Sequence, residues 1–595
     1  MGLTDSPSES AAAHGAVHGR PPGLTPPAGL SDRFRAAGWW RPETFLDDLY
    51  RTAAAAPERP AIVSERAHRP AGRRRVVVTY AQLSLYVDRF AAALASLGVA
   101  PGDPVAYQLP SWWETAALTL ACLRAGAVAV PVLPTVRAHG LHRILESTRA
   151  RVCVVPDVWE GYAHAEVLAD LAPGLPWLRH RVVVGDAAAT GAVDFAAYFR
   201  RTAHERTEAG RRSRPYAGQA DRPALLISVM GLRDSYTSVL HSPNTLYANI
   251  AAQHGGDGPG RRPGEVFLST LPLTSLASLI YTVCWPLAVG GTGVCQDVWD
   301  PGRCLDLMAA AGVDQVYAEP AYCSELLTAQ QRRPRELDRL RLVLSGGRTS
   351  TPGPLAAALR EVFGVPVLSV WGAPELGMGA LSGNAPDQGD GFRPLHGLEV
   401  SAGHGTGALA VRGPSVCLAT WEHGAPAPVP TWERADGWLD TGDLAEAGPH
   451  GGIRVLARAG TRTGAIFMVP VAEVEERLLS HPRVREAAVV AYTDPEHGEL
   501  PCAVVVPTAQ DRPPGPAELR EHLTAGGVAE AFLPTRLEIV GALPRDEEGR
   551  IRRGALRSWL TRLRPGGPRP APAERRRRQG CLVDRAGLAA PGTAP

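Results

Sequence analysis

Apolar runs of two kinds alternate along most of the chain. The runs at 104–109 and 151–156 are short and mostly apolar, as in buried strands, whereas 85–98 has the apolar spacing of a helix. This alternation predicts a doubly wound α/β body. Two later apolar runs, 341–347 and 365–372, end in glycines. Ligands of open α/β sheets bind at the carboxyl ends of strands, so we expect a ligand site there.

The pattern changes towards the C-terminal end of the sequence. From about 392 to 456 the predicted strands shorten and glycines multiply, which predicts a small antiparallel sheet or barrel. The segments 473–492 and 517–526 predict a compact α+β unit. The Pro- and Gly-rich ends are predicted to be disordered. The predicted organisation is a disordered segment 1–30, a large domain 31–460, a small domain 461–562 and a disordered Pro/Arg-rich tail 563–595.

Composition narrows the class of protein. At 595 residues the chain is too long for one hydrophobic core, and 45% hydrophobic with 21% charged residues is ordinary for a soluble protein. The net charge of +2 does not favour a nucleic-acid partner. The most apolar segment, 115–133, is interrupted by Arg124 and Pro131, so we expect a buried helix and a strand, not a membrane span. Nine cysteines without C-x-x-C spacing, and no visible secretory signal, predict a cytoplasmic protein with reduced thiols.

The chain contains no lysine, so all 62 of its basic residues are arginine. Codon bias in a GC-rich genome explains most of this. Codon bias explains less well why a lysine that the chemistry requires would be lost. The planar, forked guanidinium of Arg does not reproduce the compact point charge of Lys. The arginine run 575–578 is expected to be solvated, and nucleic-acid binding has only this tail in its favour.

Four stretches, in the right order, carry a specific resemblance. They are WGAPE (371–375), GWLDTGDLAE (437–446), PVAEVEERLLSHPRVREAAVV (470–490) and LPRDEEGRIRR (543–553). Over about residues 35–562 the chain resembles the adenylate-forming superfamily of acyl-CoA synthetases and related ligases. Three further stretches look most like the medium-chain and cyclohexanecarboxylate-CoA ligase branch: GWW (38–40), LPSWWE (109–114) and QDVWDP (296–301).

The resemblance implies a reaction, a fold and a set of ligands. Such enzymes use ATP and Mg²⁺ to convert a carboxylic acid into an acyl-adenylate and pyrophosphate. A small mobile α+β C-terminal domain then rotates and admits a thiol, usually coenzyme A. The large N-terminal region consists of doubly wound α/β subdomains and a small β-barrel-like subdomain. Departure of pyrophosphate needs cationic groups and N–H donors around the phosphates, and a lysine at the developing charge.

Part of the family's active-site pattern is retained. Asp443 matches the Asp that binds the ribose, and Arg458 matches the Arg near the inter-domain junction. Glu375 matches the Glu that coordinates Mg²⁺. Taken alone, Arg458 is equally explained by a surface ion pair.

Three more residues match the adenine site. Gly346 and Gly347 match the loop beside the adenine, and Trp371 matches the aromatic residue that stacks on it. The alternatives are that the glycines only end a strand and that Trp371 fills the core. Their order and context favour the nucleotide pocket.

The phosphate loop is the part that differs most. The family pattern Thr-Ser-Gly-Thr-Thr-Gly-x-Pro-Lys-Gly falls on residues 229–238, where only Gly231 matches. Asp234 replaces a glycine and Thr237 replaces the Lys. An acidic residue that faces a triphosphate costs several kcal/mol, roughly, in a poorly solvated site. Arg233 either offsets this charge or pairs with Asp234. The alternative is an ordinary turn before a helix that begins near Ser242 and Pro243.

Other motifs of the family are eroded as well. The stretch PLTS (272–275) lacks the His that lies near the acyl carboxylate. Thr461 replaces the hinge Asp, and Ala465 and Ile466 replace the paired glycines of the thiol tunnel. Arg550 stands at the position of the Lys that bridges the substrate carboxylate and the α-phosphate. Loss of one such preorganised charge costs roughly a hundredfold in rate.

Two hypotheses follow for the function. The first is an acyl-CoA ligase homologue with impaired activity, in which Glu375 and Arg550 act catalytically. The second is a catalytically inactive homologue that binds an acyl or nucleotide ligand or serves as a partner protein.

Overall fold

The computed structural model describes most of the chain between residues 24 and 562. The described residues are 24–207, 219–230, 236–254, 262–346, 353–382, 391–402, 407–422, 424–425, 427–448, 452–458, 471–494, 498–509, 511–526, 528, 533–545 and 551–562. The predicted tail 563–595 lies outside them. Helix α1 (Ala28–Ala36) begins within the segment 1–30, and Leu24 is already buried. The boundary predicted at residue 30 therefore falls within α1.

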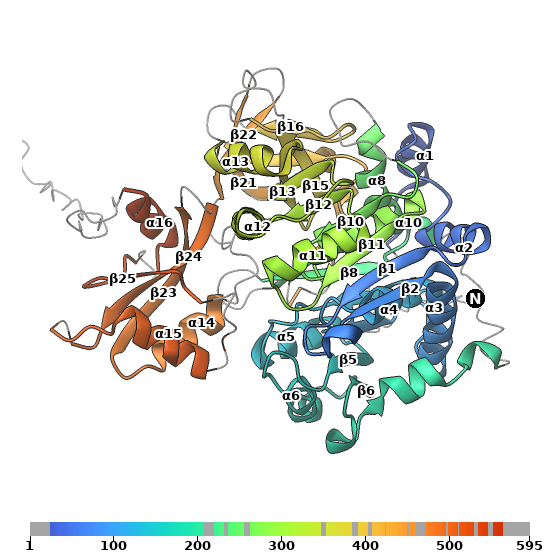
Figure 1. Ribbon diagram of the computed structural model, residues 1–595, viewed down its shortest axis with the longest axis horizontal. Coiled ribbons are helices and arrows are strands. Elements are labelled where there is room, and N and C mark those ends of the chain that lie inside the picture. The colour runs from blue at the N-terminus through green and yellow to red at the C-terminus, as the bar shows by residue number, and fades with distance from the viewer. Residues whose placement is uncertain are drawn as a thin grey trace, which may run out of the picture.

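Two large sheets form the body of the molecule (Figure 1). Within the described residues, the first sheet has nine strands in the order β16 (Arg393–Pro394), β15 (Gly377–Ser382), β14 (Val367–Ala373), β13 (Leu342–Gly346), β12 (Gln315–Ala318), β10 (Val266–Ser269), β11 (Thr292–Gln296), β1 (Pro60–Glu65) and β2 (Arg75–Thr79). The pairs from β14 through β1 are parallel, and the outer strands β2, β15 and β16 are antiparallel.

The second sheet is also mixed. Its nine described strands are β20 (Val429–Pro430), β19 (Ala419–Glu422), β9 (Tyr236–His241), β8 (Leu225–Met230), β4 (Val128–Pro131), β3 (Pro104–Tyr107), β5 (Val152–Pro156), β6 (His180–Val184) and β7 (Val193–Asp194). Strands β8 and β9 form an antiparallel hairpin around residues 231–235. The two sheets confirm the predicted α/β class.

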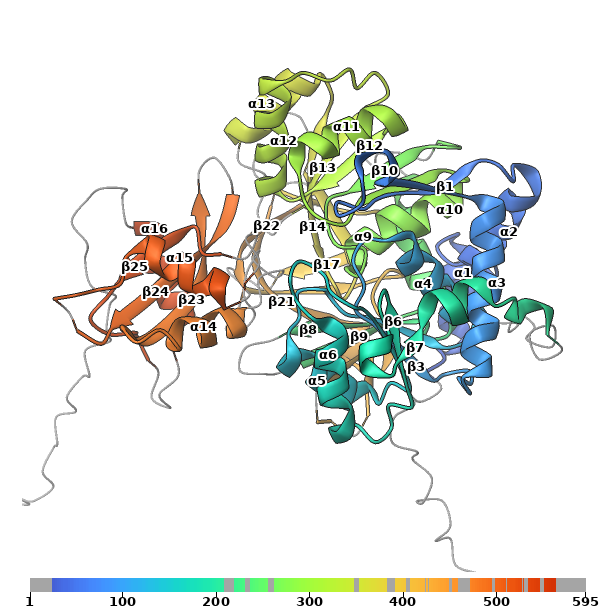
Figure 2. The same ribbon diagram turned by 60° about the horizontal axis from the view of Figure 1, so that its bottom comes forward.

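Helices lie between and outside the two sheets (Figures 1 and 2). Helix α4 (Trp113–Ala125) contacts β1 of the first sheet and β4 of the second, and it is buried over most of its length. Together with β4 it confirms the helix and strand predicted for 115–133. Among the described residues, no helix is both long and apolar enough to cross a membrane. The other helices of the body are α2 (Phe45–Ala55), α3 (Tyr80–Ser96), α5 (Ala138–Thr148), α6 (His164–Leu171), α8 (Pro243–Ala251), α9 (Leu276–Leu279), α10 (Trp285–Val289), α11 (Pro301–Ala311), α12 (Pro320–Arg332) and α13 (Gly353–Phe363).

A small antiparallel sheet follows the body in the sequence. Its four described strands are β17 (Glu399–Ala402), β18 (Gly407–Arg412), β21 (Leu439–Ala447) and β22 (Ile453–Arg458). A bridge between Phe392 and Ile453 attaches it to the chain that enters β16. This sheet confirms the prediction made for 392–456.

The C-terminal unit is a separate α+β body. It contains β23 (Val484–Asp494), β24 (Gly498–Pro507), β25 (Arg536–Ile539), α14 (Val471–Leu479), α15 (Pro516–Ala525) and α16 (Arg553–Arg562). Arg553 pairs with Glu475 through both carboxylate oxygens and so ties α16 to α14. Figure 2 shows the unit beside the end of the body that carries β21 and β22. Leu133, from the body, packs against its core.

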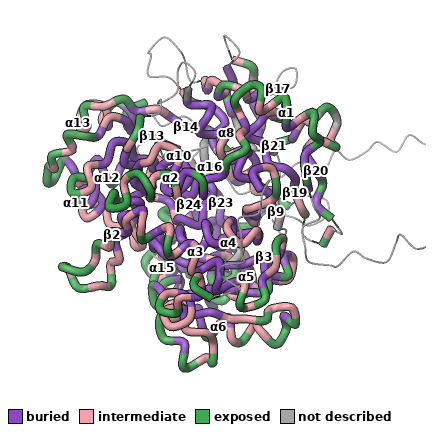
Figure 3. The backbone as a smooth tube through the Cα atoms, turned by 90° about the vertical axis from the view of Figure 1, so that its right-hand side faces the viewer, coloured by how far each residue is buried: buried purple, intermediate pink, exposed green. Residues whose placement is uncertain are grey.

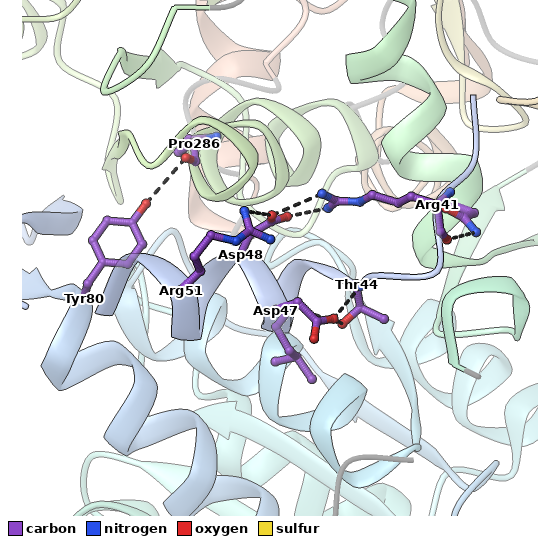
Figure 4. Close-up of polar contacts among 9 residues, drawn as sticks. Arg41, Thr44, Asp47, Asp48, Arg51, Tyr80 and Pro286 are labelled. Atoms are coloured by element: carbon purple, nitrogen blue, oxygen red, sulfur yellow. Dashed lines mark hydrogen bonds and ion pairs between the residues drawn. The ribbon is translucent and has the colours of Figure 1, made fainter. Parts of the chain in front are cut away.

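Buried residues follow the strands and the helices between them (Figure 3). One buried ion pair attaches the N-terminal segment to this core. The Asp48 carboxylate, in α2, is fully buried and pairs with both Arg41 and Arg51 (Figure 4). The Arg41 guanidinium also lies over the ring of Tyr247 in α8, 3.9 Å from its centroid. Asn244 of α8 exchanges two hydrogen bonds of 2.9 and 2.8 Å with the Arg41 main chain.

Candidate active site

Two side chains from distant segments meet beside the first sheet. The indole Nε1 of Trp371, in β14, donates to Oδ2 of Asp443, in β21, over 3.1 Å. Trp371 is 0% and Asp443 1% exposed. The two residues are 72 positions apart in the sequence. The fold thus brings together the residue that the resemblance assigns to the adenine, Trp371, and the one that it assigns to the ribose, Asp443.

The ring of Trp371 is enclosed by the neighbouring strand. Gly379 of β15 lies against it, and a Cβ at that position would come within 2.4 Å of the ring. Only glycine permits so close an approach. Because the whole residue is excluded from solvent, neither face of the indole is open to a stacked adenine in this arrangement. The burial corresponds to the alternative in which Trp371 fills the core.

Asp443 is directed inward by a local turn in β21. Gly442 has a φ of +72°, a conformation that favours glycine, and its N–H donates to Asp440 Oδ1 over 2.8 Å. The Thr441 hydroxyl donates to the carbonyl of Leu409 over 2.7 Å and accepts from the Asp443 N–H over 3.2 Å. The Thr-Gly-Asp sequence is explained by this turn: Thr441 supplies the hydroxyl that bonds the main chain, Gly442 allows the positive φ, and Asp443 supplies the inward carboxylate.

Arg458 is the register partner of Asp443. The two residues lie opposite each other in the antiparallel pair β21–β22. Cross-strand pairs of opposite charge stabilise sheets. The side chain of Arg458 lies outside the described atoms, so its predicted role stays a prediction.

Glu375 lies in the tight turn between β14 and β15 and is 1% exposed. Hydrogen bonds from two other elements hold the main chain around it. Cys417 N–H donates to the Glu375 carbonyl over 2.7 Å. His241 Nε2, at the end of β9, lies 2.7 Å from the carbonyl oxygen of Pro374. The turn is thereby joined to the β8–β9 hairpin of the second sheet.

Comparison with known proteins places this arrangement in a family. Residues 49–418 match the family described as AMP-binding enzyme, and residues 473–550 match the AMP-binding enzyme C-terminal domain. The chain belongs to the AMP-binding enzyme family. The resemblance to the adenylate-forming superfamily is confirmed.

Curated relatives of this chain are named for several acids. A salicylyl-CoA synthase / salicylate adenylyltransferase from Streptomyces sp. is 30% identical over 564 residues, which cover 89% of this chain and 96% of the relative. A medium-chain fatty-acid–CoA ligase from Escherichia coli is 26% identical over 559 residues, covering 89% and 92%. Among solved structures, apo MbtA of Mycobacterium smegmatis has a TM-score of 0.59 and 27% identity, covering 90% of this chain and 98% of its own.

Several predicted site residues lie outside the described part of the chain. They are Gly231, Gly347 and Arg550. The hinge residue Thr461 and the tunnel residues Ala465 and Ile466 lie outside it as well.

Gly346 is described and ends β13. A Cβ on Gly346 would approach the Tyr317 hydroxyl to 2.0 Å, so a side chain is excluded while Tyr317 keeps its place. Tyr317 stacks on Tyr281 with ring centroids 4.7 Å apart, and burial raises the pKa of Tyr317. The glycine is thus required by packing, whatever it contributes to an adenine site.

Thr237 and Ser275 stand where the family has a Lys and a His, and both make structural contacts in this chain. Thr237, at the lysine position, is a ladder residue of β9, with Val229 and Glu422 as register partners. Ser275, at the histidine position, accepts from the Ser278 N–H over 3.3 Å and caps α9. Ser242 caps α8, which begins at Pro243, as the alternative for this region predicts.

The donor set for Mg²⁺ is small. Within the described residues there is no group of three or more His, Cys, Asp or Glu that could hold a metal ion. Mg²⁺ in phosphate-transferring sites is bound through one or two carboxylates together with substrate phosphates. The buried carboxylate of Glu375 fits that requirement, with ATP supplying the other ligands.

His241 is a contributor to the candidate site that the sequence analysis did not name. Burial lowers the pKa of His241 to about 4, although the hydrogen bond to Pro374 opposes the shift. The available signal was that a histidine ending a buried strand needs partners for both ring nitrogens.

Proposed function

We propose that this chain activates a carboxylic acid with ATP, yielding an acyl-adenylate and pyrophosphate, and that it does so more slowly than relatives with an intact phosphate loop. The contact of 3.1 Å between Trp371 and Asp443 carries this proposal. It supports a retained ribose-binding carboxylate, and we infer from it that nucleotide binding is weakened. In the present arrangement the indole N–H uses the carboxylate that a ribose hydroxyl needs.

The chemistry is an in-line displacement at the α-phosphorus. A carboxylate oxygen of the acid forms a bond to that phosphorus, the bond to the bridging oxygen breaks, and pyrophosphate leaves with the electron pair. Mg²⁺, when bound, neutralises phosphate charge. Glu375 would hold it, Asp443 would accept from the ribose, and Arg550 would face the developing charge at the α-phosphate.

The reduced rate follows from the replaced residues. Arg550 has a permanent charge but a larger planar head than the lysine it replaces, so a close bridging position is harder to reach. Asp234 adds negative charge to the predicted phosphate loop, and Thr237 removes a positive charge. Each lost charge of this kind costs roughly a hundredfold in rate.

The relatives suggest which acids and acceptor to test. The names of the two curated relatives record medium-chain fatty acids and salicylate with CoA as acceptor, and a third relative, from Bacillus subtilis, is a 2,3-dihydroxybenzoate–AMP ligase. We infer a hydrophobic aliphatic or aryl acid as substrate, coenzyme A as acceptor and the cytoplasm as location.

Acid-dependent exchange of labelled pyrophosphate into ATP tests the proposal. Exchange is expected with at least one of these acids and is expected to disappear in Asp443→Ala. Glu446→Ala is the matched control, because Glu446 lies in the same strand but on its surface, paired with Arg454. Equal exchange in Asp443→Ala and the wild type would remove Asp443 from the site.

The second candidate is a catalytically inactive homologue that binds an acyl or nucleotide ligand. The enclosed Trp371 ring and the occupied Asp443 favour it. Thermal stabilisation by ATP–Mg²⁺ or by an acid, without exchange for any acid, is the result that supports this candidate.

A further inference from the structure

His241 links the second sheet to the turn that carries Glu375. It ends β9, is 0% exposed, and precedes Ser242, the N-cap of α8. Its Nε2 lies 2.7 Å from the Pro374 carbonyl oxygen, and its Nδ1 lies 3.0 Å from the Thr245 hydroxyl. The contacts therefore span two elements that are far apart in the sequence.

The partners fix the tautomer of the ring. A carbonyl oxygen can only accept, so Nε2 carries the proton and donates to Pro374. Nδ1 is then an acceptor, and the Thr245 hydroxyl is the donor within reach. Burial lowers the pKa of His241 to about 4, so the ring stays neutral and this hydrogen bond persists across the usual assay range.

The main chain on both sides of Glu375 is fixed from outside the turn. The Pro374 carbonyl accepts from His241 and the next carbonyl, that of Glu375, accepts from Cys417 N–H. A third hydrogen bond, from Leu376 N–H to the Ala373 carbonyl over 3.0 Å, closes the turn. Since the two peptide planes that flank Glu375 are held, the direction of its Cα–Cβ bond is held as well. Of these contacts, only the one from His241 is made by a side chain.

We propose that His241 is a positioning residue, whose Nε2–H holds the Pro374 carbonyl and thereby aims the Glu375 carboxylate for the Mg²⁺ that accompanies ATP. The inference rests on the proposed function, in which Glu375 binds this ion. His241 touches neither substrate nor metal. Groups that orient a metal ligand from behind change metal affinity about tenfold to a hundredfold when they are lost.

Two conservative variants separate positioning from general packing. The amide nitrogen of His241→Gln reaches about as far as Nε2, so it can still donate to Pro374. His241→Asn is also neutral and polar, but its amide is one bond shorter and cannot reach. His164→Asn is the matched control, because His164 is also buried (1% exposed) but bonds Gln108, the residue after β3 of the second sheet, and not the turn that carries Glu375.

The readouts are the Mg²⁺ dependence of ATP–pyrophosphate exchange, the KM for the acid and the thermal unfolding midpoint. We expect His241→Asn to raise the half-saturating Mg²⁺ concentration about tenfold, with the KM for the acid unchanged. His241→Gln should stay within about twofold of the wild type, and His164→Asn should lower only the unfolding midpoint. Calorimetric titration of ATP at several Mg²⁺ concentrations gives the same comparison if exchange is absent.

The outcomes are distinguishable. Equal Mg²⁺ dependence in His241→Asn, His241→Gln and an active wild type would overturn the inference and leave the proposed function intact. A wild type without exchange and without Mg²⁺-dependent ATP binding contradicts the proposed function, and the inference falls with it. A tenfold separation between the two His241 variants supports the positioning role.

Discussion

Replacement of Trp371 by phenylalanine separates the two roles of the indole, which packs against Gly379 and donates a hydrogen bond to Asp443. Trp371→Phe keeps an aromatic ring in the pocket beside Gly379 but removes the N–H that Asp443 accepts over 3.1 Å. A hydrogen bond to a charged group contributes about 1.5–3 kcal/mol, and the smaller ring leaves a cavity as well. We therefore expect the free energy of unfolding to fall by about 2–4 kcal/mol in this variant.

The nucleotide affinity should change in the opposite direction. With the indole N–H gone, the Asp443 oxygen that it occupied becomes available to a ribose hydroxyl. The same energy, about 1.5–3 kcal/mol, corresponds to a gain in ATP affinity of about tenfold to a hundredfold. Denaturant unfolding measures the first effect, and calorimetric titration with ATP–Mg²⁺ measures the second.

A matched control comes from another buried tryptophan. Trp285 is fully buried, and its Nε1 has no hydrogen-bond partner within the described residues, so Trp285→Phe loses packing alone. Trp371→Phe should cost about 1.5–3 kcal/mol more than Trp285→Phe. Weaker ATP binding in Trp371→Phe would refute the reasoning, because it would mean that the indole supports the nucleotide and does not compete with it.

Three further predictions concern stability. Asp48→Ala should lower the free energy of unfolding by about 3–5 kcal/mol in denaturant titration, because it leaves the largely buried Arg41 guanidinium without its fully buried carboxylate partner; a loss below about 1 kcal/mol would contradict a buried ion pair. Burial lowers the pKa of His164 from 6.5 to about 3 and that of His241 to about 4. The contribution of these histidines to stability should therefore be complete above about pH 6.5, and stability should fall below that pH, because the unfolded chain binds protons that the folded chain excludes. The expected loss is up to about 1.4 kcal/mol per pH unit for each histidine. A stability that does not change between pH 6.5 and 5 would contradict the burial of the two rings. Gly346→Ala should lower the unfolding midpoint, because the new Cβ would lie 2.0 Å from the hydroxyl and 2.4 Å from the Cζ atom of Tyr317; an unchanged midpoint would contradict this close approach.

The architecture was accessible from the sequence because burial imposes local patterns. The apolar runs predicted at 341–347 and 365–372 are β13 and β14, and the shift to short strands near 392 marks the small antiparallel sheet. Parallel strands buried on both faces are continuous apolar runs, which sequence patterns reveal directly. The start of α8 at Pro243 followed from its Ser-Pro cap for the same local reason.

The candidate site was accessible only in part. The family resemblance pointed to Trp371 and Asp443, but which way the indole points depends on Gly379 in the adjacent strand, and no local pattern encodes that contact. The role of His241 depends on a carbonyl 133 residues later in the chain. Contacts of this kind follow from tertiary packing. The sequence therefore revealed which site residues are present, but not which of them already form hydrogen bonds or pack within the fold.

The central proposal is that this member of the AMP-binding enzyme family still activates a carboxylic acid. Exchange of labelled pyrophosphate into ATP by the wild type tests it most directly, with medium-chain fatty acids, salicylate and 2,3-dihydroxybenzoate each added with Mg²⁺. We predict slow exchange that requires both an acid and Mg²⁺. Exchange with none of the acids, by a folded protein that ATP–Mg²⁺ does not stabilise, would contradict the claim.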